Sequence, residues 1–325
     1  MELICPAGTP AALRAAVEAG ADAVYAGFRD ETNARNFPGL NFSRGEMADA
    51  AAYVRARGRK LLIAINSYPE AGNLAPWRRA VDDAAAIGAD AVILADVGLM
   101  AYAADRHPDL RLHLSVQASA CNAEAVALYR EQFGVRRVVL PRVLSVADIA
   151  SLTAAADVEI EVFVFGGLCP MAEGRCTLSS YATGRSPNRQ GVCSPAEAVR
   201  YEQRGKDTVS RLGDFTINIF ADGEPAGYPT LCKGRFEAQG KASYLFEEPT
   251  SLNALPLLPQ LQAAGVAALK IEGRQRGKAY IAAVVQTYRQ ALDAFKRDGQ
   301  VPAAALSWAM EGGRETAGAY KRDWR

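Results

Sequence analysis

Short apolar runs of strand length alternate with stretches of helical period along most of the chain. In four places a glycine comes directly before an apolar run, where a left-handed cap would end a preceding helix. These four segments are 20–27, 88–96, 134–142 and 265–273. Further strands are predicted where the alternation requires them, at 3–5, 60–66, 112–119 and 159–165. The predicted helices are 9–19, 44–57, 75–87, 123–133, 146–156 and 280–297.

This alternation predicts a parallel α/β fold. Uninterrupted apolar strands are typical of parallel sheets that helices cover on both faces. An open doubly wound sheet would normally carry a glycine-rich phosphate loop after an early strand, and the sequence has neither Gly-x-Gly-x-x-Gly nor a P-loop. We therefore expect a parallel (β/α)8 TIM-like barrel.

One long stretch breaks the alternation. A barrel of this type takes about 250 residues, so the chain has an excess of roughly 75. We expect the first part of the barrel in 1–166 and an irregular or β insertion in 167–253. The last strand and helix of the barrel then fall in 254–299, and a C-terminal tail in 300–325.

Polar residues stand at the predicted strand ends, where barrels of this kind carry their chemistry. The predicted catalytic pocket residues are Asn66, Gln117, Arg142, Lys270 and Glu272, and the predicted substrate-binding residues are Asn33, Asn36 and His113. Period-two alternation places His113, Ser115 and Gln117 on one face of a strand. It also aims Lys270 and Glu272 the same way, so they should pair with each other or contact a ligand. The alternative for all these residues is a buried hydrogen-bond network.

Four of the six cysteines fall in the irregular insertion. They are Cys169, Cys176, Cys193 and Cys232, with 6, 16 and 38 residues between them. Four thiolates suit zinc or an iron–sulfur cluster. Structural zinc usually takes close Cys-x(2–4)-Cys pairs, which this spacing lacks, so a cluster is favoured. The alternative is that they are small buried apolar residues, the role we expect for Cys5 and Cys121.

The charge balance and the N-terminus limit the function classes further. Lys and Arg number 37 against 36 Asp and Glu, a net charge of +1, so nucleic-acid binding by bulk charge is not expected. The chain begins without the basic and apolar stretches of a secretory signal, and we expect a cytoplasmic protein. The most apolar long window, 84–104, contains Asp90 and Asp96, so no membrane span is expected.

Several motifs resemble those of a known family. Segments 2–8, 20–25, 33–37, 115–119 and 165–169 resemble the collagenase-like peptidase family of unassigned catalytic type. Within that family, segments 173–181, 227–235, 248–253 and 270–276 resemble the UbiU group, which belongs to the oxygen-independent ubiquinone hydroxylation system. The resemblance covers about 1–297, and the tail up to Trp324 matches more loosely.

This resemblance implies a specific activity. It implies a [4Fe-4S] cluster on Cys169, Cys176, Cys193 and Cys232 and a heterodimer with a paralogous UbiV-like subunit that has its own cluster. It also implies a UbiT-like lipid-carrier accessory protein and hydroxylation of the aromatic ring of a ubiquinone precursor without dioxygen. Relatives that hydroxylate RNA bases depend on prephenate, which makes prephenate a candidate oxygen donor. Lys270 and Arg142 would then bind the donor's carboxylates.

Three other functions stay open at this stage. RNA-base hydroxylation, as in relatives, would need a basic surface that the net charge does not indicate. A protease would have to use His107 or His113, and no His-Glu-x-x-His pattern occurs. A non-catalytic scaffold with a structural cluster is the third. The sequence leaves open the oxygen donor, the ring position, which subunit supplies the pocket, and whether the cluster is catalytic.

Overall fold

Eight parallel strands close into a barrel in the computed structural model, which describes residues 1–303 and 306–322, without the side chains of 189 and 190. The sheet runs in the order β14-β1-β2-β3-β4-β5-β6-β7, and β14 pairs with β7 to close it. The strands are β1 (Glu2–Pro6), β2 (Ala23–Ala26), β3 (Lys60–Ile65), β4 (Ala91–Leu94), β5 (Leu112–Leu114), β6 (Arg137–Val139), β7 (Glu159–Gly167) and β14 (Ala268–Ile271). The predicted TIM-like barrel is confirmed.

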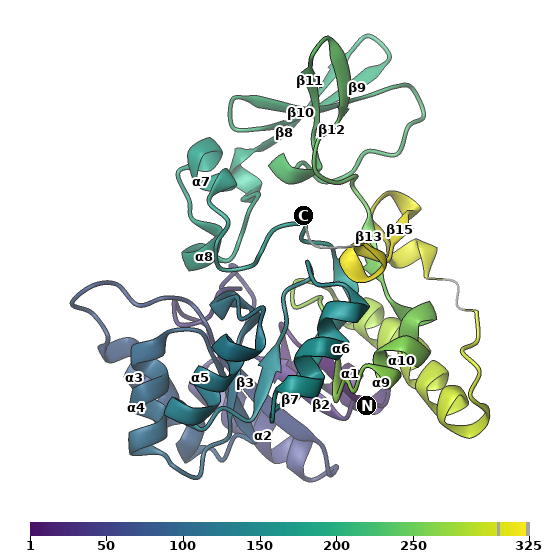
Figure 1. Cartoon of the computed structure of the whole chain (residues 1–325). Helices are drawn as coiled ribbons and strands as arrows, with labels where there is room; N and C mark the ends of the chain where they lie inside the picture. The colour runs from purple at the N-terminus through teal and green to yellow at the C-terminus, as the bar shows by residue number, and fades with distance from the viewer. Residues whose placement is uncertain (304–305, 323–325) are drawn as a thin grey trace.

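Helices surround the barrel (Figure 1). They are α1 (Pro10–Glu18), α2 (Arg44–Arg55), α3 (Ala75–Ala86), α4 (Val97–Arg106), α5 (Ala123–Phe133), α6 (Val146–Ala155), α9 (Leu258–Ala263) and α10 (Lys278–Asp298). The prediction missed α4 and α9. α4 lies in the apolar window that we considered only as a membrane span, and α9 has only six residues, too few to show a helical period.

The four glycines that precede predicted strands have the expected conformation. Gly20, Gly88, Gly134 and Gly265 all have positive φ, between 68° and 101°. Gly134 is the left-handed cap of α5, and its N–H donates to the carbonyls of Arg130 and Tyr129. A side chain at such a φ would be strained, which explains why glycine ends these helices.

The barrel interior contains an apolar cluster and, on one side, a set of charged residues. The buried interior cluster consists of Ile4, Ala23, Tyr25, Leu62, Ala64, Ala91, Ile93 and Ala268. A second and larger core lies between the strands and the helices. Because successive strand residues face opposite sides, Lys270 points to the same interior as Ala268.

The fifth strand is shorter than the pattern predicts. β5 ends at Leu114, and a 3-10 turn, η1 (Val116–Ala118), follows it. The Ser115 hydroxyl accepts a hydrogen bond from the Gln117 N–H at 3.2 Å and caps this turn. The prediction of one strand over 112–119 is therefore wrong beyond Leu114, because a serine side chain competes with the strand's backbone hydrogen bonds.

The insertion leaves the barrel after β7 and lies above it in Figure 1. It contains the short helices α7 (Leu178–Thr183) and α8 (Pro187–Gln190), the antiparallel sheet β8 (Val199–Arg204), β9 (Asp207–Leu212) and β10 (Phe215–Phe220), and the hairpin β11 (Arg235–Ala238) and β12 (Lys241–Tyr244). The chain returns in β13 (Ser251–Asn253), which pairs antiparallel with the end of β7. Residues 251–253 therefore extend the barrel sheet.

The described part of the predicted tail packs on the barrel. β15 (Glu315–Thr316) pairs with β13, and the buried Tyr320 donates its hydroxyl hydrogen to the Phe163 carbonyl of β7. Residues 304–305 and 323–325, including Trp324, lie outside the described residues. None of the helices in residues 1–303 and 306–322 combines the length and the apolar character needed to cross a membrane.

Candidate active site

A cavity of about 60 Å³ lies at the carboxyl ends of the barrel strands. All five predicted pocket residues line it, namely Asn66, Gln117, Arg142, Lys270 and Glu272. The strand ends bring them together because parallel strands all end at one rim of the barrel. Residues that the sequence did not single out for this site also line it, among them Tyr25, Arg35, Phe163, Glu173 and Arg274.

Lys270 forms an ion pair with a carboxylate that the sequence analysis missed. Its Nζ lies 2.6 Å from Glu161 Oε1, and both side chains are buried. The ammonium also lies 3.9 Å from the centre of the Tyr25 ring. Burial lowers the pKa of Lys270, while Glu161 opposes this shift by favouring the charged form. Lys270 therefore does not pair with Glu272, which was one of the two alternatives that the sequence left open. Alternation on β7, which sets Glu159 and Glu161 on one face, was the available signal.

Below this pair, a chain of charges fills one side of the barrel. Arg137 Nη1 lies 3.3 Å from Glu161 Oε2, and its other nitrogens reach Glu2 at 2.6 Å and Glu159 at 2.5 Å. Arg137 is almost fully buried, so each charge depends on its partner. Of the predicted pocket residues, Lys270 joins this buried network, which was the alternative to a pocket, and it also lines the cavity.

Arg142 connects the barrel to the insertion. Its Nε lies 2.7 Å from Glu173 Oε1, one of its Nη atoms donates to the Gly167 carbonyl, and its guanidinium stacks 4.2 Å from the centre of the Phe163 ring. Glu173 Oε2 is buried without a hydrogen-bond partner among the described residues. The Arg142 pKa is raised because the acidic groups around it, Glu173 first, outweigh the effect of burial.

The other three predicted pocket residues differ in whether their hydrogen-bonding atoms have partners. Asn66 accepts from the Ala34 N–H at 3.1 Å and donates to the Ser115 hydroxyl at 3.1 Å. Gln117 Oε1 is buried without a partner among the described residues, so it is free to accept from a bound molecule. Glu272 accepts from the Gly167 N–H at 3.1 Å, and although burial raises its pKa, Arg35 and Arg142 bring it below the ordinary value.

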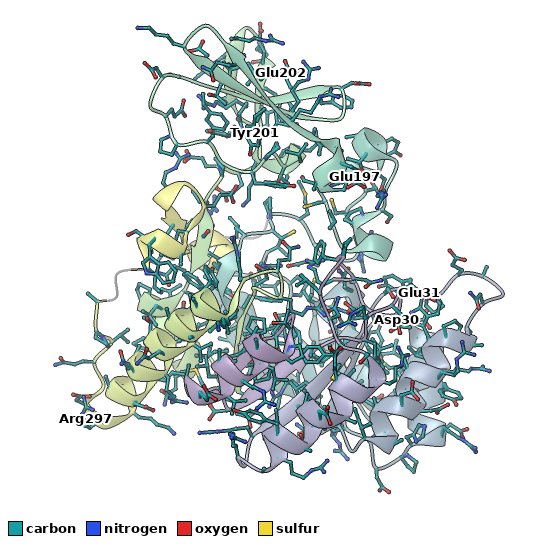
Figure 2. The ribbon with its side chains drawn as sticks, turned by 180° about the vertical axis from the view of Figure 1, so that it is seen from behind. Asp30, Glu31, Glu197, Tyr201, Glu202 and Arg297 are labelled. Carbon is teal, nitrogen blue, oxygen red and sulfur yellow. The ribbon has the colours of Figure 1, made fainter. Side chains whose placement is uncertain are left out.

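The three predicted substrate-binding residues do not line the cavity. Asn36 is exposed on the β2–α2 loop, the loop whose Asp30 and Glu31 are labelled in Figure 2. Asn33 is buried behind the lining and accepts from Arg274 Nη1 at 3.2 Å. His113 lies deeper in the barrel, beside Arg137. These positions correct the expected direct contacts, because a strand-end location in sequence does not fix the depth of a side chain.

We predict that His113 makes stability fall in mild acid. Burial first, then Arg137 and Arg111, lowers the pKa of His113 well below its ordinary value, so the folded protein holds it neutral. The unfolded chain protonates it below a pKa of about 6.5. Stability is therefore lost as the pH falls below that value, by up to about 1.4 kcal/mol per pH unit. Urea unfolding at several pH values should show a smaller loss in the His113→Gln variant, and an equal loss would contradict the assignment.

The insertion's first loops form a roof over the cavity. The Ser119 hydroxyl donates to the Glu173 carbonyl, and an Arg35 Nη atom donates to the Gly191 carbonyl. The packing is so close that a Cβ on Gly174 would lie 1.8 Å from the Gln117 carbonyl oxygen. The roof therefore packs on the barrel through backbone contacts, which leave no room for a side chain at position 174.

The four cysteines of the insertion lie within electrostatic range of one another. They come from the loop after β7, the loop before α7, the end of α8 and the 3-10 turn η3 (Leu231–Lys233). Burial raises the pKa of Cys232, and the charges that the other three thiols would carry raise it further. Burial likewise raises the pKa of Cys169 to about 12, with Glu173 adding to the effect.

This cysteine set fits a cationic metal group by its chemistry. Four neighbouring thiolates would repel one another, so a metal that compensates their charge would favour their loss of protons. In residues 1–303 and 306–322, no three Cys, His, Asp or Glu side chains are arranged as ready-made metal ligands. The thiols would therefore have to turn toward a common centre when a metal group binds.

The family follows from a comparison with known proteins. The model of peptidase family U32 matches residues 8–323. The chain belongs to peptidase family U32. This confirms the family resemblance of the sequence motifs.

Relatives of this U32 protein include hydroxylation proteins. It is 35% identical over 321 residues to tRNA hydroxylation protein P of Escherichia coli (strain K12), covering 90% of this chain and 68% of the relative. It is 30% identical over 328 residues to tRNA hydroxylation protein P1 of Bacillus subtilis (strain 168), covering 98% and 70%. It is 30% identical over 298 residues to the 23S rRNA 5-hydroxycytidine C2501 synthase of Escherichia coli (strain K12), covering 91% and 40%.

Among the solved structures that match is a U32 peptidase. The U32 peptidase Mk0906 is 16% identical, with a TM-score of 0.44, over 51% of this chain and 69% of that chain. The names of the sequence relatives support a hydroxylase role for this U32 protein.

Neither histidine is placed to act as the catalytic base of a protease. His107 Nε2 lies 2.7 Å from Asp82 on the outer helices, and His113 Nε2 accepts from Arg111 inside the barrel. Among the described residues, neither histidine has a hydrogen bond to a cysteine or serine side chain. The arrangement lacks the nucleophile and base in contact that covalent hydrolysis requires.

Proposed function

We propose that this chain is the iron–sulfur subunit of an oxygen-independent hydroxylase that acts on the aromatic ring of a ubiquinone precursor. The observation that carries the proposal is that four cysteines lie within electrostatic range of one another and that Cys169 lies within range of Arg142 in the cavity wall. Arg142 joins the cysteines to the cavity, because it lines the cavity, pairs with Glu173 of the cysteine loop and lies within electrostatic range of Cys169. The cofactor is proposed to be a [4Fe-4S] cluster on Cys169, Cys176, Cys193 and Cys232.

A cluster in this place would supply one-electron transfer. The chain's own residues provide the setting for the substrate. Tyr25 and Phe163 offer aromatic surfaces in the cavity wall, and Gln117 Oε1 offers an unused acceptor.

The partners of the proposed reaction are a UbiV-like paralogous subunit, a UbiT-like lipid-carrier protein and a prephenate-type oxygen donor. A contact surface is available on the insertion, where Tyr201 (labelled in Figure 2), Phe215, Ile219 and Phe246 are about half exposed. Large apolar side chains exposed together are typical of protein interfaces. We propose that the paralogous subunit covers them.

A second candidate function is hydroxylation of an RNA base. The names of the relatives favour it, because they are tRNA and rRNA hydroxylation proteins. The net charge of +1 favours the quinone substrate, because a protein that holds RNA ordinarily gains most of its affinity from basic residues. Both candidate functions would use the same cavity and cluster, and they differ in the substrate ring that binds in the cavity.

Deletion of the gene should distinguish the two substrates. We expect a deletion strain grown without oxygen to lose ubiquinone and accumulate precursors that lack ring hydroxyl groups, with its hydroxylated RNA nucleosides unchanged. Mass spectrometry of lipid extracts and of digested RNA from the same cultures measures both. Normal ubiquinone with loss of a hydroxylated nucleoside would establish the RNA function instead.

A further inference from the structure

Arg274 is a buried cation without a carboxylate partner among the described residues. It follows β14 and is 5% exposed, and its side chain lines the cavity. The guanidinium makes one hydrogen bond in the described part of the chain, from Nη1 to Asn33 Oδ1 at 3.2 Å. Burial lowers its pKa to about 10, which shows how poorly its charge is compensated. Five donors and a full charge are costly to keep in such a place.

The other charges of the cavity balance one another. Lys270 has Glu161 at 2.6 Å and Arg142 has Glu173 at 2.7 Å, so neither is free to attract a ligand. Among the nearby cations, Arg35 lowers the pKa of Glu272 the most. Lys270 and Arg142 thus have ion-pair partners, whereas Arg274 has none among the described residues; Glu272 favours the charged form of Arg274 only from a distance, and Arg35 opposes it. We therefore consider Arg274, which has no such partner, for contact with a carboxylate.

The surroundings of Arg274 are built to hold its guanidinium in place. A Cβ on Gly27 would lie 2.6 Å from Asn33 Cγ and 3.0 Å from Arg274 Nη1. A Cβ on Gly8 would lie 1.8 Å from the Arg274 carbonyl oxygen. Two backbone segments without side chains therefore make room for the arginine and for the asparagine that orients it, as a binding site requires.

We propose that Arg274 is the anchor of a subsite for a small molecule bearing a carboxylate. A guanidinium matches a carboxylate in shape and forms two parallel hydrogen bonds with it. A carboxylate carries one negative charge, which would compensate the charge of Arg274, whereas a phosphate would bring more and would face Glu272 and Glu173. Asn33 is a positioning residue, because it orients Arg274 from behind the lining. The subsite gives the proposed hydroxylase a class of substrate or donor, and it rests on that function for its role in a reaction.

The test compares thermal unfolding of the anaerobically purified protein with three variants. Without added ligand, Arg274→Met should raise Tm by about 2–4 °C, because it removes an uncompensated buried charge. Arg142→Met should lower Tm, because it strands Glu173. Arg276→Met, which changes an exposed arginine two residues further on, should leave Tm unchanged. Iron content is measured in each sample so that loss of metal is not taken for a change in the fold.

Sodium acetate and sodium benzoate are the probes, each compared with sodium chloride at equal ionic strength. At least one should raise the Tm of the wild type and of Arg276→Met, and neither should raise that of Arg274→Met. A lower Tm for Arg274→Met, equal stabilisation of all variants, or no stabilisation by either probe would overturn the subsite. Stabilisation by sodium phosphate alone would overturn its carboxylate preference. The assay measures binding only, so it can fail while the deletion strain still shows a hydroxylation defect, and the reverse.

Discussion

Replacement of Cys169, Cys176, Cys193 or Cys232 by Ala should remove most of the iron and sulfide from the protein. Each thiolate would supply one of the four bonds from the protein to a [4Fe-4S] cluster. Burial disfavours the charged forms of Cys232 and Cys169, as their raised pKa values show, so an incomplete set of ligands should hold the metal poorly. Protein purified without oxygen should be brown, and iron and acid-labile sulfide should fall together in each variant.

Cys121→Ala is the matched control for these variants. Cys121 is half-buried beside the barrel, where its Sγ donates to the Ser119 carbonyl at 3.3 Å. This variant should keep its full iron and sulfide content, because Cys121 is not one of the four cysteines of the insertion. Full iron loading in Cys232→Ala would show that the cluster does not use all four cysteines.

Lys270→Met should lower the free energy of unfolding by about 3–5 kcal/mol. The change leaves Glu161, which has no exposed surface, with only Arg137 at 3.3 Å to compensate its charge. Breaking a buried pair by removing one partner typically costs this much. Denaturant unfolding, followed under anaerobic conditions on iron-loaded protein, measures the difference.

A double variant separates the structural role from a role in the pocket. Lys270→Met combined with Glu161→Gln removes both charges and should recover much of the lost stability. If Lys270→Met alone unfolds like the wild type, the ion pair does not stabilise the fold. If it also fails to restore anaerobic ubiquinone synthesis in the deletion strain, Lys270 acts on the bound molecule instead.

The sequence by itself determined the barrel and the rim of its strands. Glycines such as Gly134 mark the ends of helices because other residues avoid positive φ, and apolar runs mark strands that are covered on both faces. These signals are local, so they can be read from the sequence without knowledge of contacts between distant residues. The same signals located Asn66, Gln117, Arg142, Lys270 and Glu272 at the cavity, because strand ends meet at one rim.

Only the tertiary structure decided which charged side chains have ion-pair partners and which do not. Glu161 and Glu173 lie 109 and 31 residues from the cations they neutralise, so no local pattern could pair them. The depth of His113 and the exposure of Asn36 likewise depend on how the rim and its loops pack. Arg274 stands in the sequence as one more charged residue after a strand. Its lack of a carboxylate partner is a property of the whole set of side chains around it, because compensation of a buried charge depends on every group within a few ångströms.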